Sequence, residues 1–216
     1  MRDSRVALFC TMAGLLIAWA PPGALARDSG SGPRPLREAT SRLVQELDFV
    51  FIPDPTKIQL GQTVHWMNVT HNGHTATGDA PLSLWDSGFM APTATFDYTF
   101  TAAGQYPYLC LIHERYDMVS AINVRDQVSP PSGPVGTVFT VTVATIPAPD
   151  DYVYDIQKRD PGGQWADWMT GITATNALFD STGSSPGTYR FRSRLHRVSD
   201  DAASDYSPPA AISVTP

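Results

Sequence analysis

Apolar and polar residues alternate in short runs along most of the chain. In the first half, large apolar side chains recur two positions apart at Phe49 and Phe51, Ile58 and Leu60, Val64 and Trp66, and Phe96, Tyr98 and Phe100. A period of two is typical of β-strands with one buried face. Turn residues such as Gly61 and Gly104 separate the runs. Short strands at this spacing predict an antiparallel β-sandwich.

A second set of runs follows a proline-rich stretch. Residues 126–136 contain three prolines and predict a linker. Beyond it, the alternating apolar residues are Phe139, Val141 and Val143, Tyr152, Tyr154 and Ile156, Tyr189, Phe191 and Leu195, and Ile212 and Val214. We therefore expect an all-β protein with two β-sandwich domains, at residues 45–125 and 137–216.

The first 26 residues have the pattern of a secretory signal peptide. Arg2 and Arg5 precede a largely apolar run, and residues 24–26 (A-L-A) form a small-x-small cleavage site. The run is short for a membrane span, although a retained N-terminal anchor is the alternative. Residues 27–44 are rich in Gly, Pro, Ser and charge and predict a flexible tether. The mature protein would be periplasmic or extracellular, without a transmembrane segment.

The chain is mildly acidic, with a net charge of −6. It has no block of basic residues, so nucleic acid is not an expected partner. An acidic surface favours a basic partner.

The reactive side chains are concentrated between Tyr106 and Met118, in Y-P-Y-L-C-L-I-H-E-R-Y-D-M. Cys10 would leave with the signal peptide, so Cys110 could form no internal disulfide. A free thiol is open to oxidation unless it binds a metal or is buried as a small apolar side chain. Together with His113 and Met118, it offers thiolate, imidazole and thioether donors on one loop. This set suits copper cycling between two oxidation states.

A copper site of this kind needs a second imidazole from elsewhere in the chain. The stretch W-M-N-V-T-H-N-G-H-T supplies two candidates, His71 and His74. His65 is expected on the surface, because its neighbours Val64 and Trp66 occupy the apolar face of the strand. His196 lies in the second domain and is expected to be an exposed polar residue.

Residues 45–125 resemble a cupredoxin, a small blue-copper protein of the plastocyanin, pseudoazurin and amicyanin kind. The matching segments, in the family's order, are G-Q-T-V-H-W-M-N from Gly61, H-T at His74, D-S-G from Asp86, F-D-Y-T-F from Phe96 and G-Q-Y-P-Y-L-C-L-I-H-E-R-Y-D-M from Gly104. The chain departs from the family pattern at Val119, where glycine is common, and at the charged pair Glu114-Arg115.

The resemblance implies a Greek-key β-sandwich with one type 1 copper ion. Its ligands would be His74, which precedes a threonine as in the family, with Cys110, His113 and the weak axial donor Met118. The implied function is single-electron transfer between redox partners, with the ring edge of His113 as the port. Thr75 and Asn68 would hold the ligands by hydrogen bonds.

Residues 133–216 resemble a fibronectin type III domain, an immunoglobulin-like sandwich. The resemblance rests on G-T-Y-R-F-R-S-R from Gly187, on S-D-Y-S from Ser204 and on Trp165 and Trp168. No catalytic constellation lies in this part. The alternating Arg190, Arg192 and Arg194 are either a solvated strand face or a patch for a protein or surface ligand.

Three other functions are alternatives to electron transfer for a domain with these donors. A copper-delivery or adhesion module would need no redox partner. A multicopper oxidase or copper nitrite reductase would need further histidines, whereas this chain has five in all and Cys110 is flanked by two leucines. A cupredoxin fold that has lost copper would not be expected to keep all four donors. We therefore expect a protein that is not an enzyme.

Overall fold

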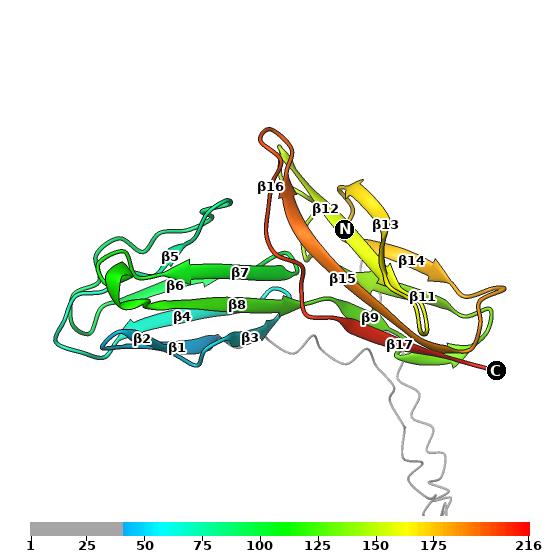
Figure 1. Ribbon diagram of the computed structural model, residues 1–216, viewed down its shortest axis with the longest axis horizontal. Coiled ribbons are helices and arrows are strands. Elements are labelled where there is room, and N and C mark those ends of the chain that lie inside the picture. Colours follow the sequence, from blue (N-terminus) through cyan, green and yellow to red (C-terminus); the bar gives the residue numbers. More distant parts are fainter. Residues whose placement is uncertain (1–40) are drawn as a thin grey trace, which may run out of the picture. The chain divides into compact units, whose positions relative to one another are not determined.

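A computed structural model describes residues 41–216. Apart from a single 3₁₀ turn, η1 (Glu114–Tyr116), all regular elements in this range are β-strands (Figure 1). The prediction of an all-β sandwich fold is thus confirmed. The signal peptide and most of the tether lie outside the described residues. Within them, no helix has the length and apolar character needed to cross a membrane.

Residues 42–125 form two four-stranded sheets. The first sheet has the order β2-β1-β4-β6, and its strands are β1 (Arg42–Leu47), β2 (Val50–Ile52), β4 (Thr63–Asn68) and β6 (Thr95–Thr99). The second has the order β3-β8-β7-β5, with β3 (Thr56–Gln59), β5 (Thr77–Gly78), β7 (Gly104–Leu109) and β8 (Val119–Arg125).

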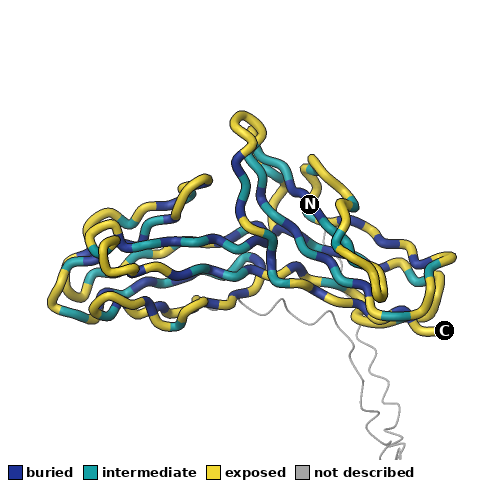
Figure 2. The backbone as a smooth tube through the Cα atoms, in the orientation of Figure 1, coloured by how far each residue is buried: buried dark blue, intermediate teal, exposed yellow. Residues whose placement is uncertain are grey.

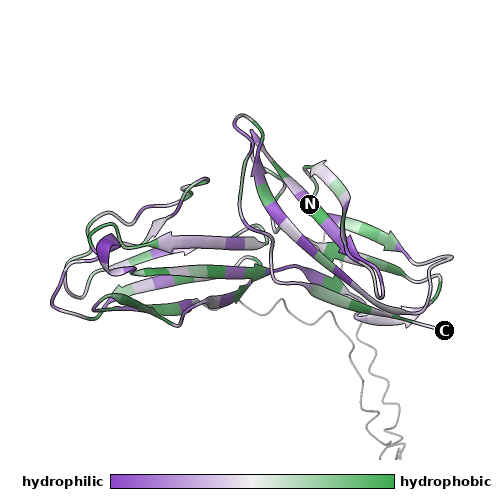
Figure 3. Cartoon of the chain, in the orientation of Figure 1, coloured by the Kyte–Doolittle hydropathy of each residue, from purple (hydrophilic) through white to green (hydrophobic). Residues whose placement is uncertain are grey.

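Aromatic side chains from both sheets pack together between them. Trp66 of β4 and Phe51 of β2 lie with their ring centroids 5.7 Å and 4.5 Å from that of Tyr108 on β7. All three side chains are almost fully buried. Buried and partly exposed positions alternate along β4 and β7 (Figure 2), and hydrophobic and hydrophilic residues alternate along the second half of β8 (Figure 3). The two sheets therefore form a sandwich, as the period of two predicts.

Strand β1 begins inside the predicted tether. Arg42, Leu43 and Val44 pair in parallel with residues 64–66 of β4. Val44 is fully buried and lies opposite Trp66. Burial of this apolar side chain explains why the ordered strand starts before residue 45.

Residues 127–215 form two further sheets. One has the order β10-β17-β15-β12-β13, with β16 paired to β15, and the other has the order β14-β11-β9. The strands are β9 (Gln127–Ser129), β10 (Ser132–Pro134), β11 (Val138–Thr142), β12 (Tyr152–Arg159), β13 (Trp165–Ile172), β14 (Asn176–Asp180), β15 (Gly187–Arg197), β16 (Ala202–Ala203) and β17 (Ala210–Thr215). Phe179 of β14 and Phe191 of β15 join the two sheets, with ring centroids 5.6 Å apart.

The stretch 126–136 differs from the linker that its prolines predict, because it contains β9 and β10. Strand β9 pairs with β11, and β10 pairs in parallel with β17. Pro130 and Pro131 fall between these two strands, where neither has to donate to a ladder. The stretch is thus paired to the second set of sheets on both sides of Pro130 and Pro131.

Candidate metal centre

The hairpin formed by β7 and β8 positions three of the four predicted ligands. Cys110 follows β7 directly, and Met118 precedes β8 directly. The Cys110 amide donates to the Met118 carbonyl at 2.9 Å, and the His113 amide donates to the Cys110 carbonyl at 3.1 Å. After η1, Asp117 adopts a left-handed conformation (φ 53°), which turns the chain back into β8. Cys110 and Met118 are fully buried, whereas His113 is half-buried.

The fourth predicted ligand, His74, is brought to the same place from a distant loop. Its Nδ1 lies 3.9 Å from Cys110 Sγ, and His113 Nδ1 lies 3.4 Å from the same sulfur. One donor atom from each of the three residues falls within 4.8 Å of the others. The two imidazole rings have centroids 4.8 Å apart. Two imidazoles and one thiol thus converge on a space that one ion could occupy.

A hydrogen bond to the Thr70 hydroxyl selects the tautomer of His74. Thr70 Oγ1 lies 2.9 Å from His74 Nε2, and its hydroxyl donates to Asn68 Oδ1 at 3.0 Å. Since a hydroxyl has one proton, it accepts from Nε2–H. His74 Nδ1 is then the unprotonated nitrogen and can bind a metal.

Asn68 organises the loop that carries His74. This fully buried side chain donates from Nδ2 to the carbonyls of Asn72 (2.7 Å) and Met90 (3.0 Å). Its Oδ1 accepts from both the amide and the hydroxyl of Thr70. Met90 also exchanges two backbone hydrogen bonds with His74. These hydrogen bonds hold the loop in one conformation.

Thr75 connects the His74 loop to the hairpin. Its amide donates to Cys110 Sγ at 3.3 Å, and its Oγ1 accepts from the Leu111 amide at 2.8 Å. An N–H directed at the sulfur stabilises negative charge on it. The expectation that Asn68 and Thr75 fix the ligands is thus consistent with their contacts.

Burial lowers the pKa of His74, nearby His113 lowers it further, and Asp48 partly offsets these effects. Neutral imidazole is therefore favoured, and it is the form that binds metals.

The turn between β1 and β2 contacts both histidine loops, which the sequence did not indicate. The Phe49 ring lies against the rings of His113 and Tyr116, with centroids 5.0 Å and 4.4 Å away. Asp48 Oδ1 accepts from Asn72 Nδ2 at 2.9 Å. Phe49 appears in the sequence merely as one more alternating apolar residue, so its position at the site could not be foreseen.

The other histidines within residues 41–216 do not join this group. His71 is exposed, and His65 pairs with Asp97. His196 was expected to be exposed, but its side chain is only 18% accessible. Its ring nitrogens lie 3.1 Å from Asp155 and 2.9 Å from Asp201. The ring thus lies between two carboxylates.

A soft thiolate with two imidazoles is the donor chemistry of a copper site, whereas magnesium or calcium would require oxygen donors. The residues present therefore fit a copper ion.

No protein-family model matches the chain. Similar solved structures include an amicyanin variant in its reduced Cu(I) form at pH 4, with 24% identity, a TM-score of 0.36 and coverage of 39% of this chain and 81% of that chain. An amicyanin variant in its Cu(I) form has 22% identity, a TM-score of 0.37 and coverage of 42% and 86%. A Cu-containing nitrite reductase from Thermus scotoductus has 24% identity, a TM-score of 0.36 and coverage of 39% of this chain but 22% of its own. With TM-scores this low, the assignments below rest on the geometry of the site.

Proposed function

We propose that the protein is an exported blue-copper protein that binds one copper ion through His74, Cys110, His113 and Met118 and transfers single electrons. The observation that carries this proposal is the convergence of three donor atoms to within 4.8 Å, from two loops that are 36 residues apart. Structural burial alone would explain a hidden Cys110. It would not explain two imidazole Nδ1 atoms directed at its sulfur.

Copper, when bound, would supply a one-electron couple between its cuprous and cupric states. Cys110 would bind as thiolate, with the Thr75 amide supporting its charge. His74 and His113 would hold the ion through their imidazoles, and Met118 would offer its thioether as the fourth donor. The hydrogen bonds of Asn68 and Thr70 hold His74 in place beforehand. A site fixed in this way would rearrange little when its charge changes, which favours rapid electron transfer.

His113 would be the port for electrons. It is the one half-buried member of the His–Cys–His group. Exposed large side chains flank it in the sequence, at Leu111, Ile112, Tyr116 and Val119. Such a surface suits brief contact with a redox protein partner. We further propose periplasmic or extracellular localisation after removal of residues 1–26. Residues 137–216 would be a fibronectin type III-like domain with a protein or surface ligand of its own.

Cyclic voltammetry of the copper-loaded mature chain tests the electron-transfer role. The proposal expects one reversible one-electron wave that persists over repeated cycles. Loss of copper to a cuprous chelator on each reduction would indicate a delivery module instead. Five histidines in the whole chain leave few donors for a second copper centre, which is why we propose a carrier rather than an enzyme.

A further inference from the structure

Arg190, Arg192 and Arg194 lie on one face of β15, and the residues opposite them on β12 differ in charge. In the antiparallel register, Arg194 lies opposite Asp155, Arg192 lies opposite Gln157, and Arg190 lies opposite Arg159. Two of the three thus face an acceptor, and the third faces another cation.

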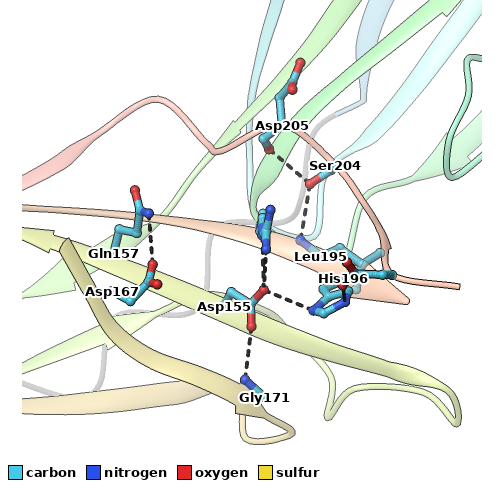
Figure 4. Close-up of polar contacts among 10 residues, drawn as sticks. Asp155, Gln157, Asp167, Gly171, Leu195, His196, Ser204 and Asp205 are labelled. Carbon is cyan, nitrogen blue, oxygen red and sulfur yellow. Dashed lines mark hydrogen bonds and ion pairs between the residues drawn. The ribbon is translucent and has the colours of Figure 1, made fainter. Parts of the chain in front are cut away.

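The first two pairs are internally satisfied. Arg194 donates to Asp155 Oδ2 at 3.0 Å, and Arg192 donates to Gln157 Oε1 at 3.0 Å and 2.7 Å. Figure 4 shows that Asp155 also contacts His196 and the Gly171 amide, and that Gln157 also contacts Asp167. The guanidinium groups of Arg192 and Arg194 therefore already have acceptors within the protein.

The third pair has no acceptor among residues 41–216. Arg159 lies over the ring of Trp165, with its guanidinium carbon 5.1 Å from the ring centroid. The side chain of Arg190 has no hydrogen bond, ion pair or ring contact with any described residue, although its backbone pairs within the sheet. Like charges directly opposite on paired strands are destabilising. The arrangement is costly unless an anion completes it.

A pocket of about 360 Å³ adjoins this pair. It is lined by both arginines, by Thr188 and by residues 160–163. The turn at 160–163 approaches β15 closely, since a Cβ atom at Gly187 would come within 2.6 Å of Pro161. Asp160 also lines the pocket, but Lys158 pairs with its carboxylate at 2.6 Å. The net charge at the pocket is therefore positive, on a chain that is acidic overall.

We propose that Arg159 and Arg190 form a binding site for the carboxylate or other oxyanion group of a small acidic ligand, either free or as part of an anionic polymer. Two guanidinium groups provide parallel N–H donors that match such a group, and the Thr188 hydroxyl offers another donor at its edge. The site is independent of the copper proposal. The proposed anion site gives Arg190 a role that Arg192 and Arg194 of the same strand do not share.

The test is a titration of the full mature chain, with ¹⁵N labelling, against inorganic phosphate, galacturonate and polygalacturonate at constant ionic strength. Saturable shifts of the Arg Nε–H signals of residues 159 and 190 are expected with at least one probe. Arg190→Gln and Arg159→Gln should each weaken binding about tenfold. Arg125→Gln, an equal change of charge on β8, should leave it unchanged. Tighter binding of the polymer than of galacturonate would identify a polymer as the source, and equal binding would identify a free acid.

Arg190→Gln should also raise the midpoint of unfolding at low salt, because it removes the repulsion within the pair. This measurement separates loss of the site from loss of the fold. Absence of saturable binding for all three probes would overturn the proposal, as would an equal loss of binding in the Arg125→Gln variant.

Discussion

The ring of Phe49 meets the ring of His113 edge to face, with centroids 5.0 Å apart and an interplanar angle of 88°. Phe49 reaches this position with a positive φ of 66°, which is uncommon for a bulky residue. Such a conformation costs about 1–3 kcal/mol and persists only where the surroundings enforce it. The turn between β1 and β2 therefore places an apolar ring against the histidine that faces the solvent.

Removing this ring should change the electronic properties of the site more than its fold. In Phe49→Ala, water would reach His113 and stabilise the more highly charged oxidised site. We expect the blue colour to persist while the reduction potential falls by roughly 50 mV, about 1 kcal/mol. Voltammetry of Phe49→Ala beside Phe49→Tyr checks this, since tyrosine keeps the ring. Equal potentials in all three proteins would show that Phe49 has no influence on His113.

Asn68 should contribute to both stability and copper retention. Asn68→Ala removes two donors and one acceptor oxygen at a fully buried position and takes away the acceptor of the Thr70 amide. The expected cost is about 2–4 kcal/mol of unfolding free energy. Urea unfolding and the rate of copper loss to a chelator measure the two effects. Asn72→Ala is the control, because alanine keeps the backbone carbonyl that accepts from Asn68. This variant should lose copper more slowly than Asn68→Ala.

The assignment of the second imidazole can be tested by comparing two neighbouring histidines. His74 is fully buried with its Nδ1 directed at Cys110, whereas His71 is exposed. His74→Ala should abolish the blue band or shift it strongly, and His71→Ala should leave it as in the wild type. Loss of the band in His71→Ala alone would reverse the assignment.

Glu46 should make stability depend on pH. Burial raises its pKa from 4.5 to about 7, and neither carboxyl oxygen has a hydrogen-bond partner within the described chain. Between pH 4.5 and 7 the unfolded chain releases this proton while the folded chain keeps it. The free energy of unfolding therefore falls as pH rises through this window, by on the order of 3 kcal/mol.

The Glu46→Gln variant removes this contribution, so urea unfolding at pH 4.5 and pH 8 should show a smaller loss in the variant than in the wild type. Asp126, whose burial also raises its pKa to about 7, is present in both proteins and cancels in the difference. Parallel pH curves for the two proteins would contradict the prediction.

The strands and the hairpin loop could be predicted because their signals are local. Alternation defines β4, β6 and β7, and Cys110, His113 and Met118 lie within nine residues of one another. The choice of His74 over His71 came from family resemblance, since a contact across 36 residues leaves no local pattern. The role of Phe49 depends on its positive φ value, which cannot be predicted from the residue type. Glu46 is a charged residue in a strand, and its burial follows only from the packing of two sheets.

The visible spectrum of the mature chain after addition of cupric ion tests the central claim most directly. The account predicts an intense thiolate-to-copper band, one equivalent of copper at saturation, and loss of the band in Cys110→Ser with the β-sandwich still folded by circular dichroism. A colourless copper complex of the wild-type chain, or a band that survives in Cys110→Ser, would contradict it.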